Sequence, residues 1–308
     1  MKTKVTALAL IVIMVLGLAA CGSGGSGDKT LQAYDGVYSE EQLVVEMVKL
    51  VVEEHTDLKV NIKEQMTGVN AFKEMTSGKP SADFLNGYDG TLLTTYLHLD
   101  PTDVPQGTSL YDYANKVAME KHKIRLLDKL GTDNTYAIAV PKDIADKYDL
   151  KTVSDLIPVA GELIFGAEHE FFSLEGSMKY GPFTEFYGLN FKDKVSVDLA
   201  LKYSAVANGN FQVTEVYATD GLNRKANLVV LEDDLGFFPE YNGAVLVRDG
   251  IFEEYKDVAP NLEEVINMLG GKFTNEIMTD LTYAVDVEGR SVKDVAKEFL
   301  TQQGLIAG

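Results

Sequence analysis

Apolar residues between positions 43 and 51 recur at the spacing of an amphipathic helix. Ser39 precedes them as a candidate N-cap, and Gln42 stands at the third helical position, the arrangement of a capping box. The pattern differs on either side. Residues 31–34 predict a short strand, and LKVNIKE at 58–64 alternates apolar and polar side chains, which also predicts a strand. The chain therefore begins as strand, helix, strand.

The same alternation of strands and helices continues to the end of the chain. Predicted strands lie within residues 81–90, 136–140, 163–168, 211–221, 228–233 and 244–250. Predicted helices lie within residues 70–80, 141–148, 194–209, 261–269 and 292–303, the last with Ser291 as a cap. Strands that alternate with helices form parallel sheets covered on both faces, so the pattern predicts an α/β protein.

The first twenty residues have the layout of an export signal. Lys2 and Lys4 form a basic start, and an apolar run over residues 7–18 is too short to span a bilayer comfortably. The residues before Cys21 resemble a bacterial lipobox, which is cut before a cysteine that receives a diacylglyceryl group. We predict a signal peptide over 1–20 and a lipid anchor on Cys21, with an unmodified thiol as the alternative.

Composition narrows the possible partners. Residues 21–29 form a flexible polar spacer, and Cys21 is the single cysteine, so no disulfide forms within the chain. A formal charge of −19 argues against binding nucleic acid or anionic lipid headgroups. The charge is compatible with a cationic ligand, and a solvated acidic surface explains it equally well. The length and a hydrophobic content of 45% predict two domains.

The residues that would indicate an enzyme or a cofactor are missing from the sequence. The four histidines are scattered and lack zinc-type spacing. The chain has no glycine-rich phosphate loop before a helix and no nucleophile elbow. Paired carboxylates carry no information in a chain with 47 acidic residues. We therefore predict no enzyme activity, no metal site and no cofactor.

Two segments share one order of elements. Residues 71–90 and 201–221 each run as helix, glycine stop, strand, tyrosine and Asp-Gly. Tyr88 and Tyr217 thereby fall at the carboxyl ends of predicted strands, where open α/β sheets bind their ligands. The repeat predicts two similar lobes whose tyrosines face a common cleft, although α/β proteins also reuse this order by chance.

The chain has 15 tyrosines and no tryptophan. Four of them stand at predicted strand ends or turns, namely Tyr88, Tyr136, Tyr217 and Tyr241. Each alone is explained by a half-buried core position with a wet hydroxyl. Together they indicate an aromatic cage. A quaternary ammonium group has no N–H to donate, and the negative faces of aromatic rings attract it at roughly 0.5–2 kcal/mol per contact.

Five stretches of the chain resemble the substrate-binding lipoproteins of glycine betaine, carnitine and choline ABC transporters. They are EEHTDLKV, DNTYAIAVPKDIADKYDLKTVSDL, TEVYATDGLNRKANLVVLEDD, FFPEYNGA and YAVDVEGRSVKDVAKEFLTQQGLI. The resemblance covers nearly all of the chain after residue 31. In that family four tyrosines form the ammonium cage, and they match Tyr88, Tyr136, Tyr217 and Tyr241. Thr91 and Gln42 match positions that bind the polar or carboxylate end of the ligand.

The chain also departs from the family pattern. The family's N-F-T-E-Q segment appears here as residues 38–42, where Tyr38 replaces asparagine and an extra acid is present. Beside the first cage tyrosine, Asp89 replaces a threonine. A carboxylate there would repel the carboxylate of a betaine and would favour choline or another cation. The second-lobe loop at 171–183 lacks the Arg and Asp-Gly usual for the family. Gln42 is equally well explained as a capping residue.

The resemblance implies a two-lobed α/β fold of the type II periplasmic-binding-protein class, with two parallel or mixed sheets and a ligand cleft between lobes. We expect one lobe over 30–134 plus 236–308 and the other over 135–235. It further implies an ABC permease and ATPase as partners, and a lipid-anchored place on the extracytoplasmic face of the cell membrane. Alternatives are a protein for another betaine such as ergothioneine, a sensory lipoprotein on the same fold, or a hydrolase.

Overall fold

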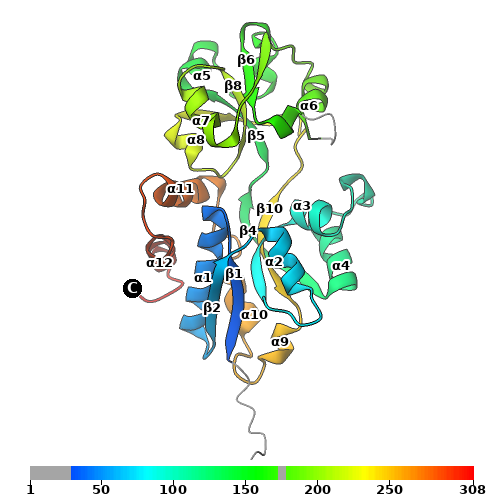
Figure 1. Cartoon of the computed structure of the whole chain (residues 1–308), viewed down its shortest axis with the longest axis vertical. Coiled ribbons are helices and arrows are strands. Elements are labelled where there is room, and N and C mark those ends of the chain that lie inside the picture. The colour runs from blue at the N-terminus through cyan, green and yellow to red at the C-terminus, as the bar shows by residue number, and fades with distance from the viewer. Residues whose placement is uncertain (1–28, 173–177) are drawn as a thin grey trace, which may run out of the picture.

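The computed structural model describes residues 29–172 and 178–308 and contains two five-stranded sheets. Figure 1 shows the two sheets in separate parts of an elongated molecule, with two crossing segments between them. Cys21 and the middle of the second-lobe loop lie outside the described residues. No helix in the described ranges combines the length and apolar character needed to cross a bilayer.

The first sheet is mixed. It has the strand order β2-β1-β3-β10-β4, in which β10 runs antiparallel to both of its neighbours. Its strands are β1 (Thr30–Asp35), β2 (Lys59–Gln65), β3 (Phe84–Tyr88), β4 (Ile124–Asp133) and β10 (Asn242–Arg248). The predicted strands at 31–34, 58–64 and 244–250 are confirmed within a few residues.

The second sheet is mixed as well. It has the order β7-β6-β8-β5-β9, and β5 runs antiparallel to β8 and β9. Its strands are β5 (Tyr136–Pro141), β6 (Ile164–Ala167), β7 (Asp193–Ser196), β8 (Val213–Tyr217) and β9 (Leu228–Leu231). Both sheets are therefore mixed, in agreement with the parallel or mixed sheets that the family resemblance implies, whereas the alternation of strands and helices alone predicts parallel ones. β5 and β10 each enter a sheet directly from the other part of the molecule, without the crossover helix that parallel neighbours need.

Helices cover both sheets. Around the first sheet lie α1 (Ser39–His55), α2 (Gly68–Met75), α3 (Asp89–Thr91), α4 (Leu110–His122), α9 (Ile251–Glu254), α10 (Leu262–Asn267), α11 (Asn275–Asp286) and α12 (Val292–Gln302). Around the second lie α5 (Lys142–Tyr148), α6 (Tyr180–Tyr187), α7 (Leu199–Ala207) and α8 (Leu222–Lys225). Ser291 caps α12 as predicted, because its hydroxyl accepts the N–H of Asp294 at 3.1 Å.

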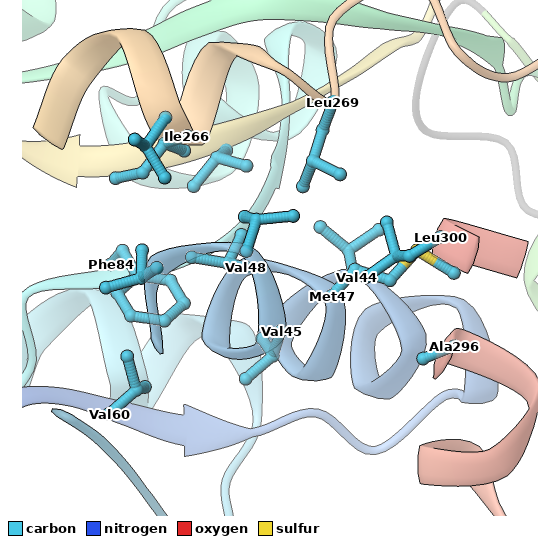
Figure 2. Packing of buried hydrophobic residues seen from close by; sticks show 14 of the residues in the cluster. Val44, Val45, Met47, Val48, Val60, Phe84, Ile266, Leu269, Ala296 and Leu300 are labelled. Carbon is cyan, nitrogen blue, oxygen red and sulfur yellow. The ribbon is translucent and has the colours of Figure 1, made fainter. Parts of the chain in front are cut away.

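The long helix α1 is the centre of the first core. Its apolar face packs between the sheet, represented by Phe84, and helices α10 and α12, represented by Ile266 and Leu300 (Figure 2). Val48 and Phe84 are fully buried. Each such side chain contributes roughly 1.5–3 kcal/mol by leaving water. This packing fixes the N-terminus of α1 at the end of the sheet where the chain crosses.

The start of α1 differs from the expectation. Tyr38 is the N-cap residue and Ser39 is already helical, so the predicted cap was one residue late. The carboxylate of Glu41 accepts the backbone N–H groups of Val37 at 2.9 Å and of Tyr38 at 3.3 Å. The capping role expected for Gln42 thus belongs to Glu41.

Two crossing segments join the parts of the molecule. β4 leads to β5 through Asn134, and the chain returns from β9 to β10. The N–H of Asn134 donates to the carbonyl of Tyr241 at 3.0 Å, and the N–H of Tyr241 donates to Asp133 Oδ1 at 2.7 Å. The crossing segments are therefore bonded to each other, next to two of the four tyrosines.

Candidate functional site

One pair of tyrosines comes from the first sheet. Tyr88 is the last residue of β3, and Tyr241 immediately precedes β10, the antiparallel neighbour of β3. Their rings stack with centroids 5.2 Å apart and an interplanar angle of 28°. Both side chains are half-buried, so neither is a core residue nor a fully exposed one.

The second pair comes from the second sheet. Tyr136 opens β5, and Tyr217, which ends β8, is its direct partner in the antiparallel register. The ring centroids lie 5.2 Å apart at 34°, and the two hydroxyls are hydrogen-bonded. The predicted position of Tyr88 and Tyr217 at the ends of strands is confirmed. Their contact with a ligand stays a prediction.

The crossing segment brings the two pairs together. Asn134 lies two residues before Tyr136, and its backbone N–H bonds the carbonyl of Tyr241. The side chain of Asn134 is also hydrogen-bonded to the hydroxyl of Tyr88. Asn134 therefore contacts both tyrosines of the first pair, and it lies two residues before Tyr136 of the second pair.

All four phenols are neutral at physiological pH. Burial is the largest cause of a raised pKa for each of Tyr88, Tyr136, Tyr217 and Tyr241. The pKa of Tyr136, for example, rises to about 12. Neutral rings keep the negative faces that attract a cation.

The two glycines beside Tyr88 serve close packing. Neither Gly87 nor Gly90 has a positive φ, and β3 passes directly into α3 at Asp89. Residues 89–91 therefore form a short helix in place of the turn that the Asp-Gly pair predicts. A Cβ on Gly90 would lie 2.2 Å from the ring of Tyr241, and one on Gly87 would lie 2.9 Å from Cβ of Leu246. Gly90 is thus the surface against which Tyr241 rests.

We expect Gly90→Ala to displace Tyr241 and to weaken ligand binding by roughly 1–2 kcal/mol, the value of one desolvated cation–π contact. Isothermal titration calorimetry measures the change. Gly78→Ala is the matched control, because a Cβ there meets nothing within 4 Å. Equal affinities of both variants would contradict the assignment of Tyr241 to the site.

Thr91 and Gln42 both make bonds within the protein. The Thr91 hydroxyl is hydrogen-bonded to the hydroxyl of Tyr241 and so lies beside the first pair. The amide of Gln42 donates to the carbonyl of Gly36 at 3.0 Å. Tyr38 is 62% exposed at the start of α1. The structure therefore brings Thr91 to the tyrosines, whereas the Gln42 side chain bonds the segment that leads into α1 and the Tyr38 side chain points largely to solvent.

Asp89 is fully buried. Its Oδ1 accepts the backbone N–H groups of Gly90 and Asn242, each at 2.8 Å, and its Oδ2 accepts the Asn242 side-chain amide at 2.8 Å. Burial raises its pKa to about 6, against these bonds. Asp89 therefore fastens the start of β10 beside Tyr241. That Asp89 favours a ligand without a carboxylate stays a prediction. Because its carboxylate is bonded to Asn242, such an effect would be indirect.

Sequence reasoning missed Glu40 as a residue of the site. It is 5% exposed at the start of α1, and its Oε2 accepts the hydroxyl of Thr219 at 2.5 Å and the amide of Asn134 at 3.3 Å. It is also hydrogen-bonded to the hydroxyl of Tyr88. Burial raises its pKa to about 7. The extra acid in residues 38–42 was the available signal.

A buried charge cluster lies behind the second pair. Lys202 on α7 is fully buried, with Nζ 3.0 Å from Glu168 and 3.1 Å from Glu215. The same Nζ lies 5.8 Å from the ring centroid of Tyr217. Burial raises the pKa of Glu215 to about 8, so it keeps its proton and donates to Glu168. Burial alone would raise the pKa of Glu168, but this bond and Lys202 together lower it.

Metal binding has no support in the described ranges, where no group of three or more histidine, cysteine, aspartate or glutamate side chains is arranged to hold an ion. The arrangement suits another chemistry. Neutral aromatic faces from two sheets, with buried acids behind them, can surround and attract an organic cation.

Comparison with known proteins agrees with this chemistry. Residues 33–302 match the family described as the substrate-binding domain of ABC-type glycine betaine transport systems. A carnitine transport binding protein of Listeria monocytogenes is 31% identical over an alignment of 314 positions that covers 100% of this chain and 99% of that protein.

Two further comparisons bear on the ligand and the fold. A Helicobacter pylori protein named as an ergothioneine transport permease and ergothioneine-binding protein is 35% identical over 176 residues, 57% of this chain and 31% of that one. A crystal structure titled as a glycine betaine/carnitine/choline ABC transporter has a TM-score of 0.80 at 28% identity, covering 89% of this chain and 99% of that one.

Proposed function

The chain belongs to the family of substrate-binding domains of ABC-type glycine betaine transport systems, and we propose that it captures a quaternary ammonium compound between Tyr88, Tyr136, Tyr217 and Tyr241. The observation that supports the proposal is that two tyrosine pairs, one at an edge of each sheet, flank the crossing segment that contains Asn134. The choline, glycine betaine and carnitine class fits such a site.

Four neutral rings offer few hydrogen-bond acceptors, and this selects a quaternary ammonium group over a primary amine. A quaternary ammonium cannot donate hydrogen bonds, so neutral aromatic faces attract it at little cost in lost hydration. A primary amine is strongly hydrated and needs acceptors for its N–H groups, and it loses more than it gains between four rings. The site thus selects by charge and shape.

Transport requires that the loaded protein differ from the empty one. We propose lobes over 30–134 plus 236–308 and 135–235 that close by a hinge at the crossing segments. A ligand that contacts tyrosines of both lobes favours the closed state by its differential affinity. The ABC permease, with its ATPase, would then receive the ligand from the closed form.

Position at the membrane completes the proposal. The protein would act on the extracytoplasmic face of the cell membrane, held by a lipid on Cys21 after removal of residues 1–20, with residues 21–29 as a flexible tether. Mass spectrometry of the protein from its native membrane tests the anchor. An N-terminus other than a lipidated Cys21 would contradict it.

A thermal-shift screen of the mature domain tests the ligand class. A ligand at 100 times its dissociation constant stabilises by about 2.7 kcal/mol, which raises the melting temperature of a domain this size by roughly 5 °C. We expect this shift from at least one of choline, glycine betaine, carnitine and ergothioneine. Ethanolamine and amino acids are controls that lack the quaternary group. A shift confined to those controls would contradict the proposed function.

The same screen examines the second ligand candidate. The similarity to the ergothioneine-binding protein favours including a bulkier betaine, since its matched segment covers 57% of this chain. Ergothioneine carries the same trimethylammonium group and would use the same four rings. A shift from ergothioneine alone would assign the ligand without changing the cage.

A further inference from the structure

Glu40 joins the two tyrosine-bearing parts of the molecule. It stands at the start of α1, which packs on the first sheet, and it accepts the hydroxyl of Thr219, two residues beyond Tyr217. It also accepts the amide of Asn134 in the crossing segment and is bonded to the hydroxyl of Tyr88. A single carboxyl thus contacts the first sheet's cage wall, the crossing and the second lobe.

One oxygen of this carboxyl is unsatisfied. Oε1 of Glu40 is fully buried and has no hydrogen-bond partner in the part of the chain that the structure describes. A buried acceptor without a partner destabilises the folded state, and a buried charge without a counter-charge does so more strongly. Such a group at a proposed ligand site is therefore a candidate for interaction with the ligand.

The charges that act most strongly on Glu40 offer it no compensation. The charges that act on its carboxyl are those of Glu41 on the same helix and Asp220 after β8, and both are negative. On the packed helix α11, Asp286 is held by Ser39 at 2.7 Å, which adds a further acid nearby. A cation bound against Tyr88 would be the missing counter-charge.

Tyr88 transmits the charge to the site. Its hydroxyl is bonded to Glu40, and a phenol that donates to a carboxylate has a more electron-rich ring. A richer ring attracts a cation more strongly by its face. The same negative charge repels a ligand carboxylate, since two like charges a few ångströms apart oppose each other in a poorly solvated site.

Resting on the proposed function, we propose that Glu40 is a specificity-determining residue of the tyrosine site, which selects quaternary ammonium ions without a carboxylate, such as choline, over zwitterionic betaines. The geometry behind this inference is the bridge to Thr219, the bond to Asn134 in the crossing segment and the unpartnered oxygen.

Glu40→Gln tests the inference, because glutamine keeps the size and most hydrogen bonds but removes the charge. At pH 8, we expect calorimetry to show that the wild-type domain binds choline roughly tenfold more tightly than glycine betaine. The variant should lose roughly tenfold in choline affinity while its betaine affinity stays or rises, which abolishes the preference.

Glu46→Gln is the matched control. Glu46 is a buried acid on the same helix, also with an unpartnered oxygen, but the charges that act on it include Lys49 and Lys293. This variant removes the same charge and should keep the wild-type preference. A parallel loss of preference in both variants would assign the effect to net charge and overturn the role of Glu40.

A second measurement uses the wild-type domain, in case Glu40→Gln does not fold. A bound cation favours the ionised carboxyl, so choline binding near pH 7 should release protons, and choline affinity should rise from pH 6 to pH 8. Calorimetry in buffers of different ionisation enthalpy measures the release. Binding without proton release would overturn the inference.

The failures are distinguishable. If the wild-type domain binds a quaternary ammonium compound and Glu40→Gln preserves its choline-to-betaine ratio, the inference about Glu40 is wrong and the proposed function stands. If the wild-type domain binds no quaternary ammonium compound, the proposed function is wrong, and the inference that rests on it is overturned as well.

Discussion

Alanine in place of both Tyr88 and Tyr217 should weaken binding of the quaternary ammonium ligand by roughly 2–4 kcal/mol, which is a loss of about 30- to 700-fold in affinity. The two rings belong to different pairs and different sheets. Each substitution therefore removes one desolvated cation–π contact, and the losses are expected to add because the residues share no direct contact.

Phenylalanine at the same positions is the matched control. It keeps the ring face and removes the hydroxyl, so Tyr88→Phe with Tyr217→Phe should bind far more tightly than the alanine pair and should lose at most the roughly tenfold attributed to the contact of the Tyr88 hydroxyl with Glu40. Thermal melts of the unliganded variants separate a lost contact from a lost fold. An alanine double variant that melts normally and binds with unchanged affinity would rule out the cage.

The placement of these tyrosines was predictable because their strands have strong local signals. The apolar runs before Tyr88 and before Tyr217 define strand ends, and both tyrosines do end strands in the structure. Strand ends at one edge of an α/β sheet are where ligands bind. The pattern thus located all four candidates, and the family resemblance matched the same four residues to its ammonium cage.

The direction of the crossing strands was not predictable in the same way. β5 and β10 carry ordinary apolar strand sequences, and nothing in those sequences states which neighbour pairs with them. Their antiparallel pairing depends on the chain passing between sheets, a long-range feature that local periodicity does not encode. β4, α4 and α11 were missed for a related reason, since their packed faces are interrupted by polar residues.

The roles of the acidic residues near Tyr88 were the hardest to predict from the sequence. Residues 40 and 41 are both glutamate, and neighbours on a helix point about 100° apart. When the N-cap is placed at Ser39 and not at Tyr38, every helical position moves by one residue, and the residue assigned to the cap changes with it. The structure assigns Glu41 to the cap and Glu40 to the tyrosine site. Asp89, selected on the sequence for its place beside Tyr88, instead supports Asn242.

Lys202→Met should lower the free energy of unfolding by roughly 3–5 kcal/mol, the cost of breaking a buried ion pair by removing one partner. Lys202 has no exposed surface and is bonded to Glu168 and Glu215, so methionine leaves one buried and one partly buried carboxyl without a cation. Lysine in a helix normally reaches solvent, which is why the sequence did not indicate this role. Urea unfolding followed by circular dichroism measures the loss.

The loss should depend on pH. Without Lys202, the folded-state pKa values of both carboxyls lie above their unfolded value of about 4.3, so stability falls as pH rises through that interval. The deficit should therefore be smaller at pH 5 than at pH 8.

Lys142→Met, which removes an exposed pair with Asp146 at 2.7 Å, should cost no more than about 1 kcal/mol. Adding Glu168→Gln and Glu215→Gln to Lys202→Met should restore much of the stability, because no buried charge then remains uncompensated. A triple variant as unstable as Lys202→Met would show that packing, and not charge, holds this cluster behind Tyr217.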